Sequence, residues 1–216
     1  MKQLCIFLGP PGSGKGTQAQ FLQDAHGVTV LSTGNLIRQE IKRQTHVGKA
    51  VEACVRAGKL VPDAYLIGII EPLLSELDLV KSITIFDGFP RTLAQAEQFD
   101  ALLKQHDKVL DQVFYFDASL EIILKRIGGR RVCSYCNKTY HQDYLPPKIA
   151  DQCDVCSKAL IQRDDDSPET VQRRYTAYCS ETAVLKDYYS QLGLCTVIDT
   201  TRPLSHVTTD LVQSIL

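Results

Sequence analysis

The chain has 216 residues, a formal net charge of −1, and 44% apolar and 23% charged residues. These proportions are ordinary for a globular protein, and the lack of a basic excess argues against a general nucleic-acid binder. No apolar stretch approaches the roughly 20 residues of a membrane-spanning helix, so we expect no membrane partner. Residues 4–8 are apolar and run into a glycine-rich motif without a cleavage site, so we expect residues 3–8 to form a buried strand rather than part of a signal peptide. We therefore expect a cytoplasmic protein.

Short apolar segments alternate with helical periodicity along most of the chain. Segments rich in β-branched and aromatic residues predict buried parallel strands at residues 3–8, 29–31, 83–87, 112–116 and 195–199. Helical periodicity predicts helices at residues 15–25, 62–77, 93–105, 120–127, 168–192 and 203–216. Pro62, Pro168 and Pro203 suit the first turn of a helix. The alternation predicts an α/β fold with a parallel sheet.

Two stretches depart from this alternation. Residues 32–61 predict two short helices without a strand, whereas residues 129–166 are rich in cysteine, proline and aspartate and lack a helical stripe. We expect both stretches to be insertions at the carboxyl edge of the sheet.

A glycine-rich segment, residues 9–17, joins the first expected strand to the first expected helix. In this context glycines let backbone N–H groups turn inward around a phosphate, and the helix N-terminus adds positive charge. Lys15 adds a full charge for the β- and γ-phosphates. The alternative is a turn without a ligand, but the strand, glycines, lysine and helix together favour a phosphate-binding P-loop. The candidate residues are Gly12, Ser13, Gly14, Lys15, Gly16 and Thr17.

Asp87 ends the expected strand 83–87. An acid at that place beside a P-loop can hold Mg²⁺ through water, and the alternative is an aspartate of a strand-end turn. We favour the Mg²⁺ role.

Four of the eight cysteines form two CxxC pairs separated by sixteen residues: Cys133 with Cys136, and Cys153 with Cys156. This spacing predicts a tetrahedral metal site, and four thiolates leave no open coordination position, so the ion is expected to be structural. Zinc is the expected ion, one per chain, and iron is the alternative metal. Two disulfides or four unligated thiols are the alternatives without a metal, which a reducing compartment disfavours.

Six stretches resemble adenylate kinase along nearly the whole chain: GPPGSGKGTQ (9–18), LSTGNLIR (31–38), AGKLVPD (57–63), FDGFPRTLAQA (86–96), RIGGRR (126–131) and RDDDSPETVQRR (163–174). The resemblance implies a monomer with a three-layer P-loop fold, a five-stranded parallel sheet and the reaction ATP + AMP = 2 ADP. It also implies a core (residues 1–31, 62–128 and 167–216), a nucleoside-monophosphate-binding flap (residues 32–61) and a zinc-binding lid (residues 129–166).

The resemblance further implies two nucleotide sites. The AMP site would comprise Thr33, Arg38, Lys59, Leu60, Val61, Gly88, Arg91, Gln95, Arg163 and Arg174. Beyond the P-loop, the ATP site would add Arg126, Arg130, Thr139, Tyr140 and Arg202. The catalytic groups would be Lys15, Arg91, Arg130, Arg163 and Arg174. Because the attacking phosphate oxygen of AMP is already anionic, such a site needs no general base and works by positioning and charge stabilisation.

The resemblance also bears on four individual positions or runs in the chain. Asn35 stands where many family members have aspartate, and Arg202 stands where lysine is common. Gln95 is expected to read the adenine edge of AMP. In the run Asp164–Asp166, the first two aspartates match the family pattern and Asp166 is expected to face water.

Two other functions are weighed against an adenylate kinase. One is a related kinase with a UMP or CMP acceptor or a GTP donor, and Gln95 and the long lid argue against the pyrimidine acceptors. The other is a zinc-ribbon module that binds nucleic acid, against which the slightly negative net charge argues.

Overall fold

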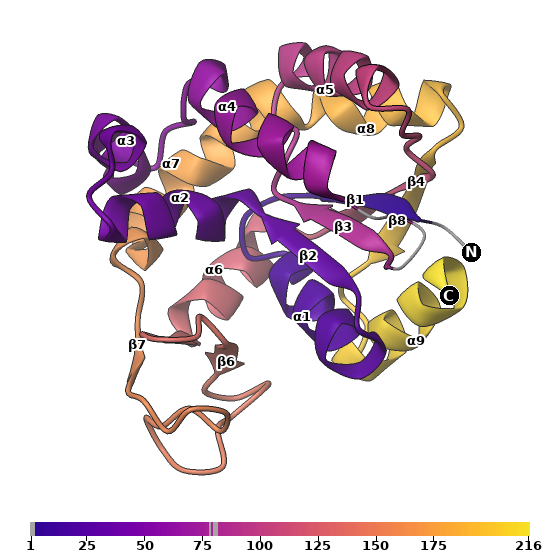
Figure 1. The fold of residues 1–216 in the computed structure, drawn as a ribbon. Coiled ribbons are helices and arrows are strands. Elements are labelled where there is room, and N and C mark those ends of the chain that lie inside the picture. Colours follow the sequence, from indigo (N-terminus) through magenta and orange to yellow (C-terminus); the bar gives the residue numbers. More distant parts are fainter. Residues whose placement is uncertain (1–2, 78, 80–81) are drawn as a thin grey trace.

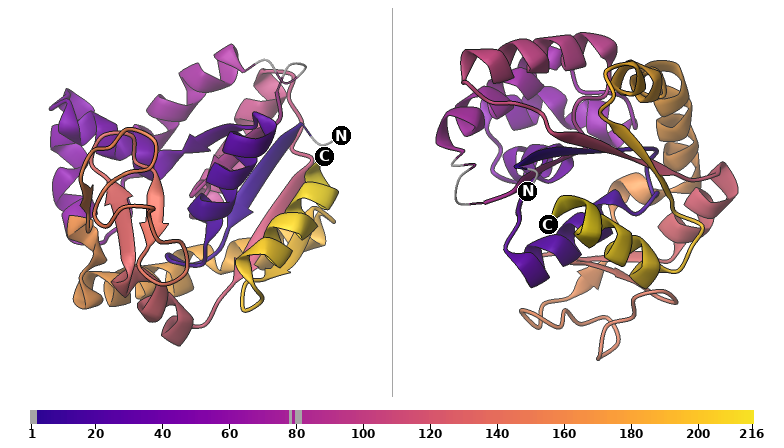
Figure 2. Two further views of the ribbon diagram at one scale, coloured as in Figure 1. Left: turned by 90° about the horizontal axis from the view of Figure 1, so that it is seen from below. Right: turned by 90° about the vertical axis from the view of Figure 1, so that its right-hand side faces the viewer.

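The computed structural model describes residues 3–77, 79 and 82–216. Within these residues, five parallel strands form one sheet in the order β2-β3-β1-β4-β8. The strands are β1 (Leu4–Leu8), β2 (Thr29–Ser32), β3 (Thr84–Asp87), β4 (Gln112–Asp117) and β8 (Cys195–Asp199). Helices cover both faces of the sheet (Figures 1 and 2). The predicted three-layer α/β fold is therefore confirmed, and each strand begins and ends within one residue of its expected limits.

Both faces of the sheet are buried, which explains why β1 is a continuous apolar run. Leu4, Ile6 and Leu8 point to the cluster formed with α4 (Asp63–Glu76), α5 (Leu93–Gln105) and α8 (Val184–Gln191). Cys5 and Phe7 point the other way, to α1 (Lys15–His26) and α9 (Leu204–Ile215). This alternation of side chains along the strand divides the core into two layers, one on each face.

The helix predictions hold for α1, α4, α5, α6 (Leu120–Gly128) and α9 within one or two residues. Pro168 occupies the first turn of α7 (Pro168–Ala177), as expected. Pro62 and Pro203 instead precede their helices, with ψ angles of 139° and 142°. For these two prolines the prediction of a first-turn position is wrong by one residue.

The prediction of a single helix over residues 168–192 is also wrong in one respect. Helix α7 passes into a wide π turn, η2 (Tyr178–Thr182), before α8 begins. The backbone N–H of Ala183 donates to the carbonyl of Tyr178 at 2.9 Å, which widens the helix by one residue. Contacts with distant residues favour the wide turn, since the Thr182 hydroxyl donates to the Arg91 carbonyl at 2.7 Å.

The two stretches that depart from the alternation have secondary structure of their own. Residues 32–61 contain α2 (Thr33–Lys42), which begins where β2 ends, and α3 (His46–Arg56). Residues 129–166 contain a small antiparallel sheet in the order β6-β5-β7, formed by β5 (Arg130–Cys133), β6 (Thr139–His141) and β7 (Leu160–Ile161). A short 3₁₀ helix, η1 (Asp164–Asp166), then leads into α7. Both insertions lie at the same end of the main sheet (Figures 1 and 2).

Candidate active site

The P-loop connects β1 to α1. Gly12 and Gly14 have positive φ angles of 79° and 101°, and a Cβ atom at Gly12 would lie 2.8 Å from Ile127 Cδ1. Glycine is therefore required at position 12 both by backbone angle and by space. Lys15 Nζ donates to the carbonyl oxygens of Gly9 and Pro10, each at 2.7 Å. Burial lowers the pKa of Lys15 to about 7, so an anion beside it would restore the protonated form.

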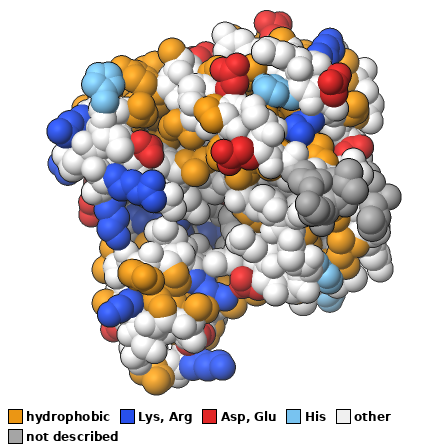
Figure 3. Space-filling model, viewed as in Figure 1, with side chains coloured by type: hydrophobic (Ala, Val, Ile, Leu, Met, Phe, Trp, Pro, Cys, Tyr) orange, Lys and Arg blue, Asp and Glu red, His pale blue; other side chains and the backbone are white. Residues whose placement is uncertain are grey.

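A cavity of about 740 Å³ opens beside the P-loop. Figure 3 shows a hollow at this face with lysine and arginine side chains around it. Among the described residues that line the cavity, nine are lysine or arginine and two are aspartate or glutamate. Such an imbalance favours a strongly anionic ligand.

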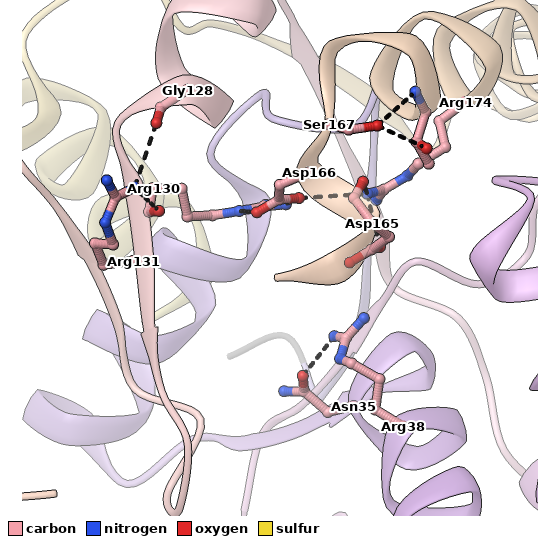
Figure 4. Close-up of polar contacts among 10 residues, drawn as sticks. Asn35, Arg38, Gly128, Arg130, Arg131, Asp165, Asp166, Ser167 and Arg174 are labelled. Atoms are coloured by element: carbon pink, nitrogen blue, oxygen red, sulfur yellow. Dashed lines mark hydrogen bonds and ion pairs between the residues drawn. The ribbon is translucent and has the colours of Figure 1, made fainter. Parts of the chain in front are cut away.

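Two aspartates of η1 hold two arginines at the cavity wall (Figure 4). Arg130 makes a bidentate contact with Asp166, in which Nε donates to Oδ2 at 2.8 Å. Arg174 Nη1 donates to Asp165 Oδ2 at 2.9 Å and lies 3.8 Å from Asp166 Oδ1. Asp165 and Asp166 therefore fix the directions of both guanidinium groups.

The expectation that Asp166 faces water is wrong. Asp166 is 2% exposed, and Asp164 is the exposed member of the run. A 3₁₀ helix turns by about 120° per residue, so consecutive aspartates cannot share one environment. Asp166 is on the side of η1 that faces Arg130.

Three further arginines converge on the same cavity. Arg38 Nη2 donates to Asn35 Oδ1 at 2.7 Å, a neutral partner (Figure 4), and Arg91 Nε donates to the Gly88 carbonyl at 2.7 Å. Burial, and then the neighbouring Arg174, lowers the pKa of Arg91 to about 10. Burial, and then the neighbouring Arg130, lowers the pKa of Arg163 to about 9. These shifts show that the carboxylates present do not fully offset the buried positive charge.

The residues expected to bind AMP are brought together. A small adjoining cavity of about 60 Å³ is lined by Thr33, Arg38, Lys59, Leu60, Val61, Arg91, Gln95 and Arg174, among others, and Gly88 and Arg163 line the main cavity. The buried Gln95 amide has two protein partners, because Oε1 accepts from the Arg91 N–H at 2.8 Å and Nε2 donates to Asp63 Oδ1 at 2.6 Å. An amide has one N–H and one lone pair beyond these two contacts.

The residues expected to bind ATP fall into two groups. Arg126 joins the P-loop to the segment after β8, since its guanidinium donates to the Ser13 carbonyl at 3.2 Å and to the Thr200 carbonyl at 2.5 Å. Arg202 also lines the cavity, and its Nη1 donates to Asp210 Oδ2 of α9 at 2.5 Å. Thr139 and Tyr140 also border the cavity, but the Tyr140 hydroxyl lies inside the lid and accepts from the Asp154 N–H at 2.8 Å.

His141 is a cavity residue that the motifs did not predict for the site. It follows Tyr140 in β6, lines the cavity, and its ring packs at a tilt of 40° against that of Tyr144, with ring centroids 4.4 Å apart. Its place next to Thr139 and Tyr140 was the one signal that could have identified it.

The four paired cysteines come together in the lid. Their sulfurs all lie within 4.8 Å of one another, with Cys133 to Cys156 at 3.4 Å and Cys136 to Cys153 at 3.5 Å. A tetrahedral ion with metal–sulfur bonds of about 2.3 Å sets sulfurs about 3.8 Å apart. Backbone N–H groups of Tyr135 and Cys136 point at the Cys133 sulfur at 3.4 and 3.5 Å, as they do around thiolate ligands. The donor set therefore fits a metal ion.

The P-loop, the arginine-lined cavity and the covering insertions together define a P-loop phosphotransferase. A sequence model of the adenylate kinase family matches residues 7–194. An adenylate kinase of Archaeoglobus fulgidus is 44% identical over 94% of this chain and 93% of its own length. That of Carboxydothermus hydrogenoformans is 42% identical over 94% of both chains, and that of Thermotoga neapolitana is 38% identical over all of this chain and 98% of its own. The chain belongs to the adenylate kinase family, as its motifs indicate.

The pairing of Asp166 with Arg130 gives a first prediction. Replacing Asp166 by Asn leaves two largely buried guanidinium groups without their shared carboxylate, and we expect the free energy of unfolding to fall by about 3 kcal/mol. Asp164→Asn is the matched control and should leave stability unchanged, because Asp164 is exposed. Urea unfolding of both variants measures this. Equal stability of Asp166→Asn and the parent chain would contradict the assigned pairing.

Proposed function

We propose that this chain transfers the γ-phosphoryl group of ATP to AMP in the reversible reaction ATP + AMP = 2 ADP. The observation that carries the proposal is the surplus of lysine and arginine around one cavity beside the P-loop. Family membership supports the same reaction. The substrates are therefore ATP, AMP and ADP, and no nucleic-acid partner is proposed.

In this proposal the P-loop N–H groups from Gly12 to Thr17 cradle the donor phosphates, and Lys15 contacts the β- and γ-phosphates. The attacking phosphate oxygen of AMP is anionic and needs no general base. Rate acceleration comes from arginines that face the transferring group and stabilise its charge: Arg91, Arg130, Arg163 and Arg174. Arg126 and Arg202 contact the ATP side, whereas Thr33, Arg38, the Lys59–Val61 segment, Gly88 and Gln95 contact AMP.

Asp87 is the proposed partner of magnesium. It lies at the end of β3, lines the cavity, and accepts a hydrogen bond from Ser32 Oγ at 3.2 Å. A carboxylate in that place fits the hydrated ion that accompanies ATP, and bound Mg²⁺ would neutralise phosphate charge.

We also propose the domain roles that the sequence suggests. The core comprises residues 1–31, 62–128 and 167–216, the flap residues 32–61, and the lid residues 129–166. Closure of flap and lid would exclude water from the phosphates. Among the described residues, no helix has the length and apolarity needed to cross a membrane. We propose a cytoplasmic monomer, since reducing conditions preserve the thiolate ligands.

A coupled assay with AMP, UMP and CMP as acceptors, and ATP and GTP as donors, tests the reaction. We expect the pair ATP and AMP to give the highest kcat/KM, and Lys15→Met to lower it at least ~100-fold, because the transferring group loses a charge donor. Lys104→Met, an exposed site on α5, is the control and should retain full activity. Near-normal activity of Lys15→Met, or a preference for a pyrimidine acceptor, would contradict the proposal.

The metal in the lid is proposed to be one structural zinc ion. Three of the four cysteines, Cys133, Cys153 and Cys156, form the lid core with Tyr140 and Leu160. By contrast, Ile149 and Val155 are 64% and 65% exposed. Since little apolar surface is buried there, metal binding supplies folding free energy that a larger core would otherwise provide.

Removing the zinc should lower the melting temperature while activity at low temperature survives, since Lys15 and the arginines are not ligands. Atomic absorption, then melting and activity curves with and without a strong chelator, measure this. Cys136→Ser should mimic chelation, and Cys179→Ser, an exposed cysteine outside the cluster, should not. A metal-free protein with unchanged melting would refute the structural role.

A further inference from the structure

The backbone of Arg91 is held on both sides. Its N–H donates to Gln95 Oε1 at 2.8 Å, and its carbonyl accepts from Thr182 Oγ1 at 2.7 Å. The side chain is held as well, because Nε donates to the Gly88 carbonyl at 2.7 Å. Gln95 and Gly88 are close in sequence to Arg91, but Thr182 reaches it across 91 positions of the chain.

Thr182 takes this place because of the wide turn η2. It is the last residue of that turn, is 7% exposed, and lines the cavity together with Ala177 and Tyr178. One residue added to a helix rotates the residues after it by about 100°. The wide turn therefore changes which side chains of this segment face Arg91, and it accounts for the break in the helix expected over residues 168–192.

The Arg91 guanidinium lies close to the Gly88 backbone on one side and borders the cavity on the other. A Cβ atom at Gly88 would lie 3.1 Å from Arg91 Nη2 and 3.2 Å from Thr33 Oγ1. A shift of the Arg91 backbone would alter the geometry of the Nε–Gly88 hydrogen bond and with it the direction of the guanidinium. Misplacing a catalytic group by about 1 Å can lower a rate by as much as ~100-fold.

We propose that Thr182 is a positioning residue for phosphoryl transfer, whose hydroxyl fixes the Arg91 carbonyl and thereby aims the Arg91 guanidinium. This inference rests on the proposed contact of Arg91 with the transferring phosphates. It assigns a role in the reaction to η2, a segment far from the P-loop in sequence.

The test compares Thr182→Val, which keeps the shape and removes the hydroxyl, with Thr182→Ser, which keeps the hydroxyl. We expect Thr182→Val to lower kcat about tenfold with little change in the KM for ATP, and Thr182→Ser to restore kcat to within about twofold. Thr176→Val is the matched control, since the exposed Thr176 donates to the Gln172 carbonyl of its own helix at 3.1 Å. That control should keep the parent kcat.

A double-mutant cycle with Arg91→Ala separates this inference from the proposed function. If the hydroxyl acts through Arg91, Thr182→Val should change the activity of Arg91→Ala by less than about twofold. Near-normal activity of Arg91→Ala alone would overturn the proposed role of Arg91. A low activity of Arg91→Ala, together with parent-like kcat for Thr182→Val, would overturn the role of Thr182.

An equal tenfold loss in both backgrounds would also overturn the inference, because the hydroxyl would then act elsewhere. Melting curves are measured first for every variant, and the assays are run at a temperature below the unfolding transition of each one. If Thr182→Val does not fold, Thr182→Ala takes its place in the same cycle, with the same expected and contrary results.

Discussion

The structure depends on a buried excess of positive charge around one cavity. Burial lowers the pKa of Lys15 to about 7, that of Arg163 to about 9 and that of Arg91 to about 10. Asp165 and Asp166 orient Arg174 and Arg130 but do not balance all of this charge. Nucleotide phosphates would supply the missing negative charge, so that substrate binding, stabilisation of the site and catalysis draw on the same electrostatic interaction.

The lid contributes to this charge through its own small sheet. Arg130 begins β5, which ends at Cys133, and Arg163 follows β7, whose Leu160 pairs with Cys133. One antiparallel ladder thus connects the cysteine cluster to the two arginines at either end of the lid. A metal ion bound there would stiffen the ladder without touching the phosphates, which separates its structural effect from the chemistry of the site.

Features set by contiguous sequence were predictable, and features set by distant contacts were not. The strands, the P-loop and the CxxC pairs each have a local pattern, so their positions could be predicted from the sequence. The burial of Asp166 depends on Arg130, 36 positions away, and the wide turn η2 on contacts such as that of Thr182 with Arg91. The family pattern, which covers only the first two aspartates of the run, and periodicity over a short window carry no information about such partners. The sequence therefore predicted an exposed Asp166 and an unbroken helix.

The central claim is that phosphate charge, rather than the nucleoside, completes this cavity. Thermal melting with tripolyphosphate, ADP and adenosine at equal concentrations tests it most directly, because a ligand that binds the folded state more tightly stabilises it more. Tripolyphosphate and ADP should both raise the melting temperature, to a degree that falls as salt increases, whereas adenosine should leave it nearly unchanged. Stabilisation by adenosine equal to that by ADP, with none from tripolyphosphate, would contradict the claim.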